Sequence, residues 1–511
     1  MPILRWLTRD DDLKSAGKAA YRLLREVPEM GAGDKDSGNM IIQGDNLEAL
    51  KALLPFYAGQ VKCVYIDPPY NTGSAFTQYD DNLEHAIWLS ILYPRLELLR
   101  ELLSEDGTIF IQLDDNEQAY TRVICDEIMG RNNFVASVVW QKRTSPDNRL
   151  RLGNAHDYIL VYVKNKGTEK YFNQLDVNNA RLKDFKNPDN DPRGPWASTD
   201  LTGMTGHATQ EQFYTIVSPN GKKFPPPDGR CWALAEATFH SLLADNRIWF
   251  GKNGDSRPRV KRYLSELEGQ NAWTWWTNEE VGHNQEAKKE INVLFGADNP
   301  FETPKPERLI QRIIHLSTNP GDLVLDSFLG SGTTAAVAHK MNRRYIGIEM
   351  GEHAKTHCAV RLKKVIDGEQ GGISESVNWQ GGGGFRFYTL GDTIFDENGQ
   401  IRDTITFHQL AAHIWFYETK TPFNKPKSKS PALGVHNDIA YALLYNGILH
   451  DKRIDGGNVL TTKTLEAIRN GLNKTAYDKI VIYGEASRIS QAKLKELNIE
   501  FKQTPYDVRA K

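Results

Sequence analysis

Residues 61–74 read VKCVYIDPPYNTGS, and this stretch decides how the rest of the chain is interpreted. The short, mostly apolar run from Val61 to Ile66 predicts a buried strand. It ends at an acid, two prolines and a tyrosine, Asp67 to Tyr70. Because prolines fix φ and lack a backbone N–H, the turn leaves Asp67 and the Pro68 carbonyl as acceptors beside an aromatic ring. The same residues also fit an ordinary turn, since Asp-Pro and Pro-Pro are common in loops.

Strands and helices alternate around this turn from Met40 onwards. Expected strands are MIIQGD (40–45), VKCVYI (61–66), GTIFIQLDD (107–115), VASVVW (135–140) and DYILVYV (157–163), with amphipathic helices between several of them. Strands separated by helices predict an α/β fold with a doubly wound, mostly parallel sheet.

Composition divides the chain further. We expect a helical arm and linker over 1–39, with a short charged helix at 10–27, and one half of the α/β domain over 40–164. An irregular insertion rich in Pro, Gly, Asn and Trp follows at 165–300, and the second half of the α/β domain returns at 301–367. A glycine-rich linker (368–384) precedes a small C-terminal α/β domain (385–511).

Bulk properties exclude several classes of protein. The 511 residues carry a net charge of −2, so any nucleic-acid surface must be local. Four cysteines lie far apart without a CxxC pair, and the histidines show no ligand spacing, so we expect neither disulfides nor a metal. The start, MPILRWLTRDDD, does not resemble a signal peptide, and no apolar run is long enough for a membrane span. We expect a cytoplasmic protein.

A second strand end carries the pattern of a cofactor site. In LVLDSFLGSGTTAA (323–336), Gly330 and Gly332 stand between an expected strand and helix, where glycines let a ligand approach the backbone. The lysine of a phosphate-binding loop is absent, because Thr333 and Thr334 stand in its place. Glu349 ends the next strand, RYIGIE, where an acid can accept both ribose hydroxyls. This pattern predicts a nucleoside cofactor without a triphosphate.

The two strand ends together suggest chemistry on an exocyclic amine. Such an amine is a poor nucleophile, and acceptors for its hydrogens, Asp67 and the Pro68 carbonyl, would help it to react. Tyr70 offers a face on which a flipped base can stack.

DPPY together with FLGSGTT resembles the DNA amino-methyltransferases that use S-adenosylmethionine, in the permuted order of the β class. The closest resemblance is to the modification (Mod) subunits of Type III restriction–modification systems. It is carried by GDNLEALKALLPFYAGQVKCVYIDPPYNTG (44–73), TPKPERLIQRII (303–314), HDYILVYVKN (156–165) and GGFRFYTLGD (383–392). It covers 40–395 well, and it is looser beyond residue 400.

This resemblance implies roles for individual residues. Asp67, Pro68, Pro69 and Tyr70 would form the catalytic motif, and 40–164 and 301–367 the catalytic and cofactor-binding halves. The expected cofactor-binding residues are Asp45, Lys305, Pro306, Asp326, Phe328, Gly330, Ser331, Gly332, Thr333 and Glu349. Aspartate at the head of the motif favours N6 of adenine over N4 of cytosine.

The insertion is the expected target-recognition domain. Basic residues gather in RIWFGKNGDSRPRVKRYLSE (247–266) and in the loop after Gln141, and we expect DNA contacts from Lys142, Arg143, Arg257, Arg259, Lys261 and Arg262. A solvated surface explains any single one of them equally well. The resemblance implies duplex DNA as substrate, a homodimer and a helicase–nuclease restriction partner.

Three other functions stay open at this stage. The chain could methylate cytosine N4 without a partner, serve chiefly as a specificity module for a helicase–nuclease, or methylate RNA or a protein amide. A nicotinamide enzyme would leave DPPY unexplained and would need a third glycine in the turn.

Overall fold

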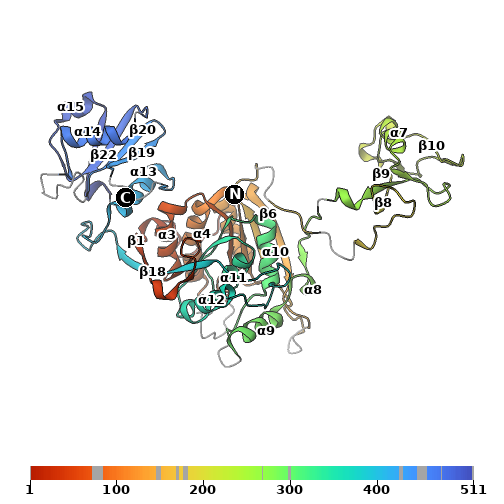
Figure 1. The fold of residues 1–511 in the computed structure, drawn as a ribbon, viewed down its shortest axis with the longest axis horizontal. Helices are drawn as coiled ribbons and strands as arrows, with labels where there is room; N and C mark the ends of the chain where they lie inside the picture. Colours follow the sequence, from red (N-terminus) through yellow and green to blue (C-terminus); the bar gives the residue numbers. More distant parts are fainter. Residues whose placement is uncertain are drawn as a thin grey trace. The chain divides into compact units, whose positions relative to one another are not determined.

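The computed structural model describes residues 2–71, 84–145, 151–167, 172–176, 182–267, 269–296, 301–424, 430–445, 457–473 and 475–508. The chain forms two compact units (Figure 1). The first comprises Met1–Asn173 and Trp273–Lys511, and the second comprises Gln174–Ala272. The second unit lies within the predicted insertion 165–300. The remaining domain boundaries stay predictions.

A central sheet organises the first unit. Six neighbouring strands run parallel, in the order β18 (Gly384–Thr393), β3 (Met40–Gln43), β17 (Arg344–Glu349), β16 (Leu323–Asp326), β4 (Val61–Ile66) and β5 (Leu103–Leu113). β7 (His156–Val163) pairs antiparallel with β5 and with β6 (Phe134–Gln141), and β15 (Trp275–Trp276) follows β6. The predicted mostly parallel α/β fold is confirmed.

Helices cover both faces of this sheet. On one face, Val64 and Ile66 of β4 pack in one core with leucines of α3 (Asn46–Tyr57) and α4 (His85–Leu102). On the other, α10 (Glu307–Ser317) contacts β4, α11 (Thr333–Lys340) contacts β17, and α12 (Val360–Ile366) packs on α11. Because both faces are buried, β4 is apolar almost throughout instead of alternating.

The winding of the sheet reverses between β4 and β16. From β4 the chain continues through α4 to β5 on one side, and from β16 it continues through α11 to β17 on the other. The two strands are parallel neighbours, with Cys63 opposite Val324 and Val64 opposite Leu325. Connections that leave in opposite directions open a crevice at the carboxyl ends of such strands, where α/β proteins bind ligands.

The N-terminal arm differs from the predicted helix at 10–27. Only two short helices form, α1 (Arg9–Asp12) and α2 (Ser15–Lys18), and Arg22–Glu26 becomes strand β1. β1 pairs antiparallel with β18 and so extends the central sheet. The free edge of β18 offers backbone partners that override the weak helical pattern of this segment.

The predicted linker 368–384 also packs against the domain. Ile373 and Trp379 are buried, and Trp379 Nε1 donates a hydrogen bond to the Val365 carbonyl at 2.8 Å. The segment leads into β18, which continues the central sheet beside β3. The glycine content predicts a linker over these residues, but two buried apolar side chains anchor the segment to the domain.

Beyond β18 lies the predicted small α/β region. β20 (Ile439–Leu443), β22 (Lys479–Gly484) and β24 (Ile499–Gln503) run parallel, and β19 (Ala432–His436) is antiparallel to β20. Helices α13 (Phe407–Thr419), α14 (Thr462–Gly471) and α15 (Gln491–Glu496) accompany them. No helix in the described ranges is long and apolar enough to cross a membrane.

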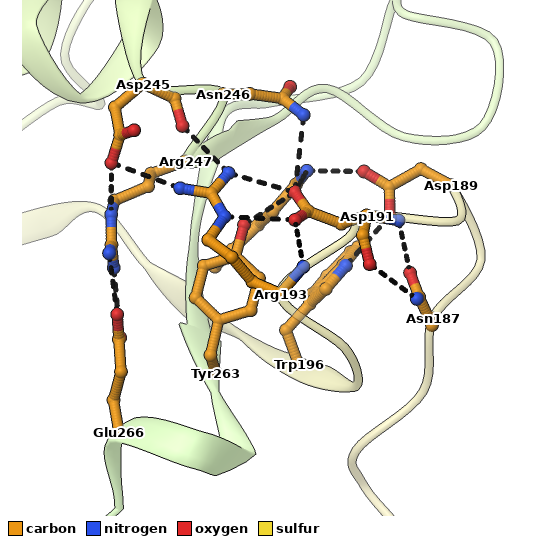
Figure 2. A network of polar contacts seen from close by, with 11 residues as sticks. Asn187, Asp189, Asp191, Arg193, Trp196, Asp245, Asn246, Arg247, Tyr263 and Glu266 are labelled. Carbon is orange, nitrogen blue, oxygen red and sulfur yellow. Dashed lines mark hydrogen bonds and ion pairs between the residues drawn. The ribbon is translucent and has the colours of Figure 1, made fainter.

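The described residues of the second unit form short antiparallel strand pairs, a longer helix and short helical turns. β14 (Arg259–Tyr263) lies between β13 (Ile248–Trp249) and β8 (Trp196–Asp200), β9 (Thr202–Met204) pairs with β12 (Arg230–Trp232), and β10 (Ile216–Val217) with β11 (Lys223–Phe224). Helix α7 (Glu236–Ala244) adds Phe239 to a core around Trp232. A polar network around Asp191 ties the unit together (Figure 2).

Candidate active site

The crevice between β4 and β16 holds a cavity of about 580 Å³. The residues that line it include the whole DPPY motif, Asp67 to Tyr70, and Asp326 to Thr333 of the glycine turn, apart from Ser327 and Gly332. Lys142 to Ser145, Asp114, Asp157 and Phe301 to Lys305 complete much of the wall. The two motifs, more than 250 residues apart in the chain, therefore face one cavity of the size expected for a small-molecule site.

Asp67 has a partner on each carboxylate oxygen. Tyr70 donates its hydroxyl to Oδ1 at 2.6 Å, and Lys305 donates its ammonium to Oδ2. Burial raises the pKa of Asp67, and the Lys305 charge and the Tyr70 hydrogen bond oppose that rise.

Neighbouring side chains fix the DPPY turn. Trp88 Nε1 donates to the Pro69 carbonyl at 2.7 Å. Asn71, at a left-handed φ of 57°, donates from Nδ2 to Glu117 Oε1 at 2.9 Å. The turn is thus held both by its prolines and by side chains of α4 and the loop after β5.

A second carboxylate stands behind Tyr70. Asp157, at the start of β7, accepts hydrogen bonds from Lys142 Nζ at 2.5 Å and Gln112 Nε2 at 3.2 Å, and the Tyr70 hydroxyl lies 3.3 Å from it. Gln112 also donates to the Tyr70 oxygen at 3.0 Å. This network holds the Tyr70 hydroxyl towards Asp67.

The glycine turn is ordered by Asp326. Its Oδ1 accepts from the Phe328 N–H at 2.9 Å and its Oδ2 from the Thr334 hydroxyl at 2.6 Å. Burial raises the pKa of Asp326 to about 7. Gly330 and Gly332 adopt left-handed φ values of 57° and 81°, a conformation that other residues adopt only with strain.

Comparison with known proteins identifies the family of this chain. A model of the DNA methylase family matches residues 61–360, from the start of β4 to the start of α12. This chain belongs to the DNA methylase family.

Relatives of this chain include two Mod subunits. The Type III restriction–modification enzyme StyLTI Mod subunit of Salmonella typhimurium LT2 is 36% identical over 371 residues, 66% of this chain and 55% of that protein. The probable Type III HindVI Mod subunit of Haemophilus influenzae Rd is 33% identical over 410 residues, 69% of this chain and 54% of that protein. The Type II methyltransferase M.EcaI of Enterobacter cloacae is 30% identical over 322 residues, 61% of this chain and 66% of that protein. This chain thus spans about half the length of the two Mod subunits.

Four of the expected cofactor residues lie outside the described lining of the cavity. Glu349 accepts from the Gly330 N–H at 2.7 Å, and its Oε1 lies 2.9 Å from His353 Nε2, so Glu349 supports the glycine turn. Asp45 caps α3 through the Leu47 N–H and pairs with Arg95 at 2.8 Å. Pro306 precedes α10 and Gly332 precedes α11. A role of these four residues with a cofactor stays a prediction.

The expected DNA-binding residues divide into two groups. Lys142 and Arg143 line the cavity, and Lys142 is paired with Asp157. Arg257, Arg259 and Arg262 are exposed on the second unit. Contact of these residues with DNA stays a prediction.

The structure does not support the expectation that Lys261 contacts DNA. Its side chain is 1% exposed, and its ammonium is paired with Asp189 and, at 3.2 Å, with Asp191. Arg193, Tyr263 and Asn246 also donate hydrogen bonds to Asp191, and those of Arg193 and Tyr263 hold the pKa of that carboxyl far below its usual range (Figure 2). The β alternation turns Lys261 into this network, so we no longer expect it to touch a phosphate.

Asp157, Gln112 and Asp114 were not predicted from the sequence. Asp114 follows the strand TIFIQL, which is the same pattern, a carboxylate after a buried strand, that singled out Asp67, whereas Asp157 precedes the apolar run YILVYV. Burial raises the pKa of Asp114 to about 6. Gln112 had no such signal, because a polar residue within an apolar strand does not reveal which face it occupies.

Proposed function

We propose that this protein transfers the methyl group of S-adenosylmethionine to N6 of an adenine that is flipped out of duplex DNA. The observation that carries this proposal is that the DPPY motif and the glycine turn line one cavity at the reversal point of the sheet. Membership of the DNA methylase family supports the reaction class.

The residues of the cavity fit S-adenosylmethionine. Phe328 and Leu329 offer an apolar wall for an adenine, the backbone at Gly330 is open to close approach, and Asp326 can face a positive charge. When bound, the cofactor supplies a methyl group already activated by a sulfonium. Positioning then matters more than strong acid–base catalysis.

Asp67 and the Pro68 carbonyl are the acceptors for the amino group of the target base. Hydrogen bonds from both amine hydrogens draw the nitrogen lone pair out of the ring and favour a tetrahedral amine. The Asp67 charge also stabilises the positive charge that develops on nitrogen. The surplus proton leaves after transfer, so Asp67 need not be a strong base.

Tyr70 provides the stacking face for the base. Its hydroxyl is held by Asp67 and Gln112, which fixes the plane of the ring before a base arrives. Stacking on a fixed aromatic ring is worth about 1–3 kcal/mol per base. This contribution offsets part of the free energy of unpairing and unstacking.

The second unit is the proposed reader of the DNA sequence, with Arg257, Arg259 and Arg262 as its exposed basic residues. We further propose that the protein is the modification subunit of a Type III restriction–modification system, that it acts as a homodimer in the cytoplasm, and that it serves a helicase–nuclease partner. The two Mod relatives support this assignment.

Single-molecule sequencing of DNA from cells that express the protein tests the reaction. We expect N6-methyladenine within one short motif, and no modification in cells that express Asp67→Ala. Detection of N4-methylcytosine instead would show that the target base is cytosine. Unmodified DNA, together with label from S-adenosylmethionine in RNA or protein alone, would refute the proposal.

A further inference from the structure

Lys305 approaches the DPPY motif from the second half of the fold. Its ammonium donates to Asp67 Oδ2 and lies 5.5 Å from the centroid of the Tyr70 ring. The Lys305 side chain is 11% exposed and that of Asp67 is 19% exposed, so water reaches the pair only in part. The Lys305 ammonium, a cationic N–H donor, therefore contacts Asp67 and lies beside the Tyr70 ring. The proposed reaction assigns both of these groups to the target base.

The backbone around Lys305 is anchored. Pro304 and Pro306 flank the residue and restrict φ on both sides. Glu307 is buried between Lys340 at 2.8 Å and Arg361 at 2.7 Å. The side chain of Lys305, by contrast, has four rotatable bonds, so its ammonium can leave Asp67 by rotation while the backbone stays in place.

We propose that Lys305 is an internal competitor for the target amine: its ammonium occupies Asp67 until a flipped base displaces it. The inference rests on the proposed function and deepens it, because it names the group that a base must displace to reach the acceptor. Lys305 is thus a positioning residue that tunes selection of the base, in addition to any contact with the cofactor.

The pair also has an electrostatic consequence. A buried carboxylate without a partner tends to take up a proton, and a protonated Asp67 would offer the amine a weaker acceptor. Charged or titratable groups that act on Asp67 are Lys305 from the segment before α10, Tyr70 from the turn, Tyr65 on β4, Asp157 on β7 and Asp326 on β16. Among these five, Lys305 carries the positive charge.

Removal of Lys305 should therefore have two opposite effects. The acceptor loses its competitor, which favours binding of the base at high pH. It also loses its counter-charge, which moves titration of Asp67 to higher pH and weakens transfer near neutrality. A residue that served only to hold the fold together would produce neither effect.

The binding test compares two duplexes that differ at one nucleotide, once sequencing has given the recognition motif. One carries the target adenine and the other an abasic site, and both are titrated in the presence of S-adenosylhomocysteine at about pH 9, above the range in which buried carboxyls usually titrate. In Lys305→Met, we expect the preference for the adenine duplex to rise about 5-fold or more, since a competitor lowers apparent affinity by the fraction of sites it occupies. An unchanged preference would overturn the proposal.

The kinetic test follows the acid limb of kcat against pH. Lys305→Met should move this limb up by about one pH unit or more, whereas Lys305→Arg, which keeps the charge, should restore it. Lys62→Met is the matched control, because Lys62 pairs with Asp106 at the opposite end of β4. A rise in the KM for S-adenosylmethionine with no shift of the limb would assign Lys305 to the cofactor alone and overturn the proposal.

A third measurement separates failure of this inference from failure of the proposed function. Acetylation of lysines by acetic anhydride is followed by mass spectrometry without DNA or cofactor. In Asp67→Asn, Lys305 should be acetylated at least about 3-fold faster, since its partner has lost its charge, while Lys62 is unchanged. If Lys305 is acetylated faster in Asp67→Asn but the wild-type protein methylates no DNA, the proposed function is refuted and the ion pair stands. If the acetylation rate is unchanged and the wild-type protein is an active methyltransferase, the ion pair is refuted.

Discussion

Arg361 Nη2 lies 2.7 Å from Glu307 Oε1, and both side chains are almost completely buried. Arg361 also donates from Nη1 to the Thr333 hydroxyl at 2.8 Å. Glu307 begins α10 and Thr333 begins α11, so one guanidinium joins the segment that carries Lys305 to the glycine turn. Arg361 and Lys340 hold the pKa of Glu307 below its usual value although burial acts to raise it.

Arg361→Met should destabilise the protein strongly. It leaves the Glu307 carboxylate buried with one cation fewer, and breaking a buried pair in this way costs about 3–5 kcal/mol. Urea or thermal unfolding measures the loss. Lys493→Met, which removes the exposed pair with Glu496, should change stability by less than about 0.5 kcal/mol. Equal effects of the two variants would contradict the role given to Arg361.

Asp67→Ala should abolish methyl transfer and leave cofactor binding largely intact. The variant removes the acceptor for the target amine, and loss of one such electrostatic group lowers kcat by about 100-fold or more. Single-turnover transfer and equilibrium binding of S-adenosylmethionine, measured on the same preparation, separate the two steps. Turnover at the wild-type rate would disprove the assignment.

Tyr70→Phe and Tyr70→Ala should separate the hydroxyl from the ring. The phenylalanine variant loses the 2.6 Å hydrogen bond to Asp67 but keeps a stacking face, so kcat should fall by about 10-fold with little change in DNA affinity. The alanine variant should also lose about 1–3 kcal/mol of base binding. Fluorescence of 2-aminopurine at the target position reports the stacked base, and equal signals from both variants would exclude the stacking role.

Replacement of the exposed arginines of the second unit should change the salt dependence of DNA affinity, whereas replacement of its buried lysine should change folding. Neutralising Arg257, Arg259 and Arg262 together should reduce the slope of log affinity against log salt by up to about 3, because each lost phosphate contact removes about 0.9. Lys261→Met should leave that slope unchanged. Its effect should be on folding, seen as faster hydrogen exchange in residues 182–267, because Asp189 and Asp191 lose their shared cation.

Cofactor binding should depend on pH through Asp326. Burial raises the pKa of this carboxyl to about 7, so the empty protein holds a proton there below that pH. A cation bound beside it favours the ionised form. Affinity should therefore fall as pH drops below about 7, and binding should release a proton. Calorimetry in buffers of different ionisation enthalpy measures this release.

Two variants check whether the proton released on cofactor binding comes from Asp326. Asp326→Asn should abolish the proton release. Asp114→Asn should preserve it, although burial raises the pKa of Asp114 to about 6, because Asp114 follows β5 and not the glycine turn. Release that persisted in Asp326→Asn would place the titrating group elsewhere.

Local pattern was enough to predict where the strands that carry the two motifs end. An apolar run that stops at DPPY, and another that stops at an acid and a GxG turn, identify two βα junctions without any knowledge of pairing. Strand–helix alternation then predicts a parallel sheet, in which all such junctions lie at one edge. The family follows from these local signals, since each motif consists of residues close in the chain, whereas the shared crevice also needs β4 and β16 to be neighbours in the sheet.

Tertiary structure alone decided which side chains meet. Lys305 pairs with Asp67 because its segment leads into α10, which packs on β4, and Asp157 reaches Tyr70 because β7 pairs with β5. Lys261 is buried, although its neighbours Arg259 and Arg262 are exposed, because two aspartates approach it from 70 and 72 residues away. Hydrogen bonds and ion pairs of this kind depend on distances between segments remote in sequence, and the order of residues along the chain does not contain those distances.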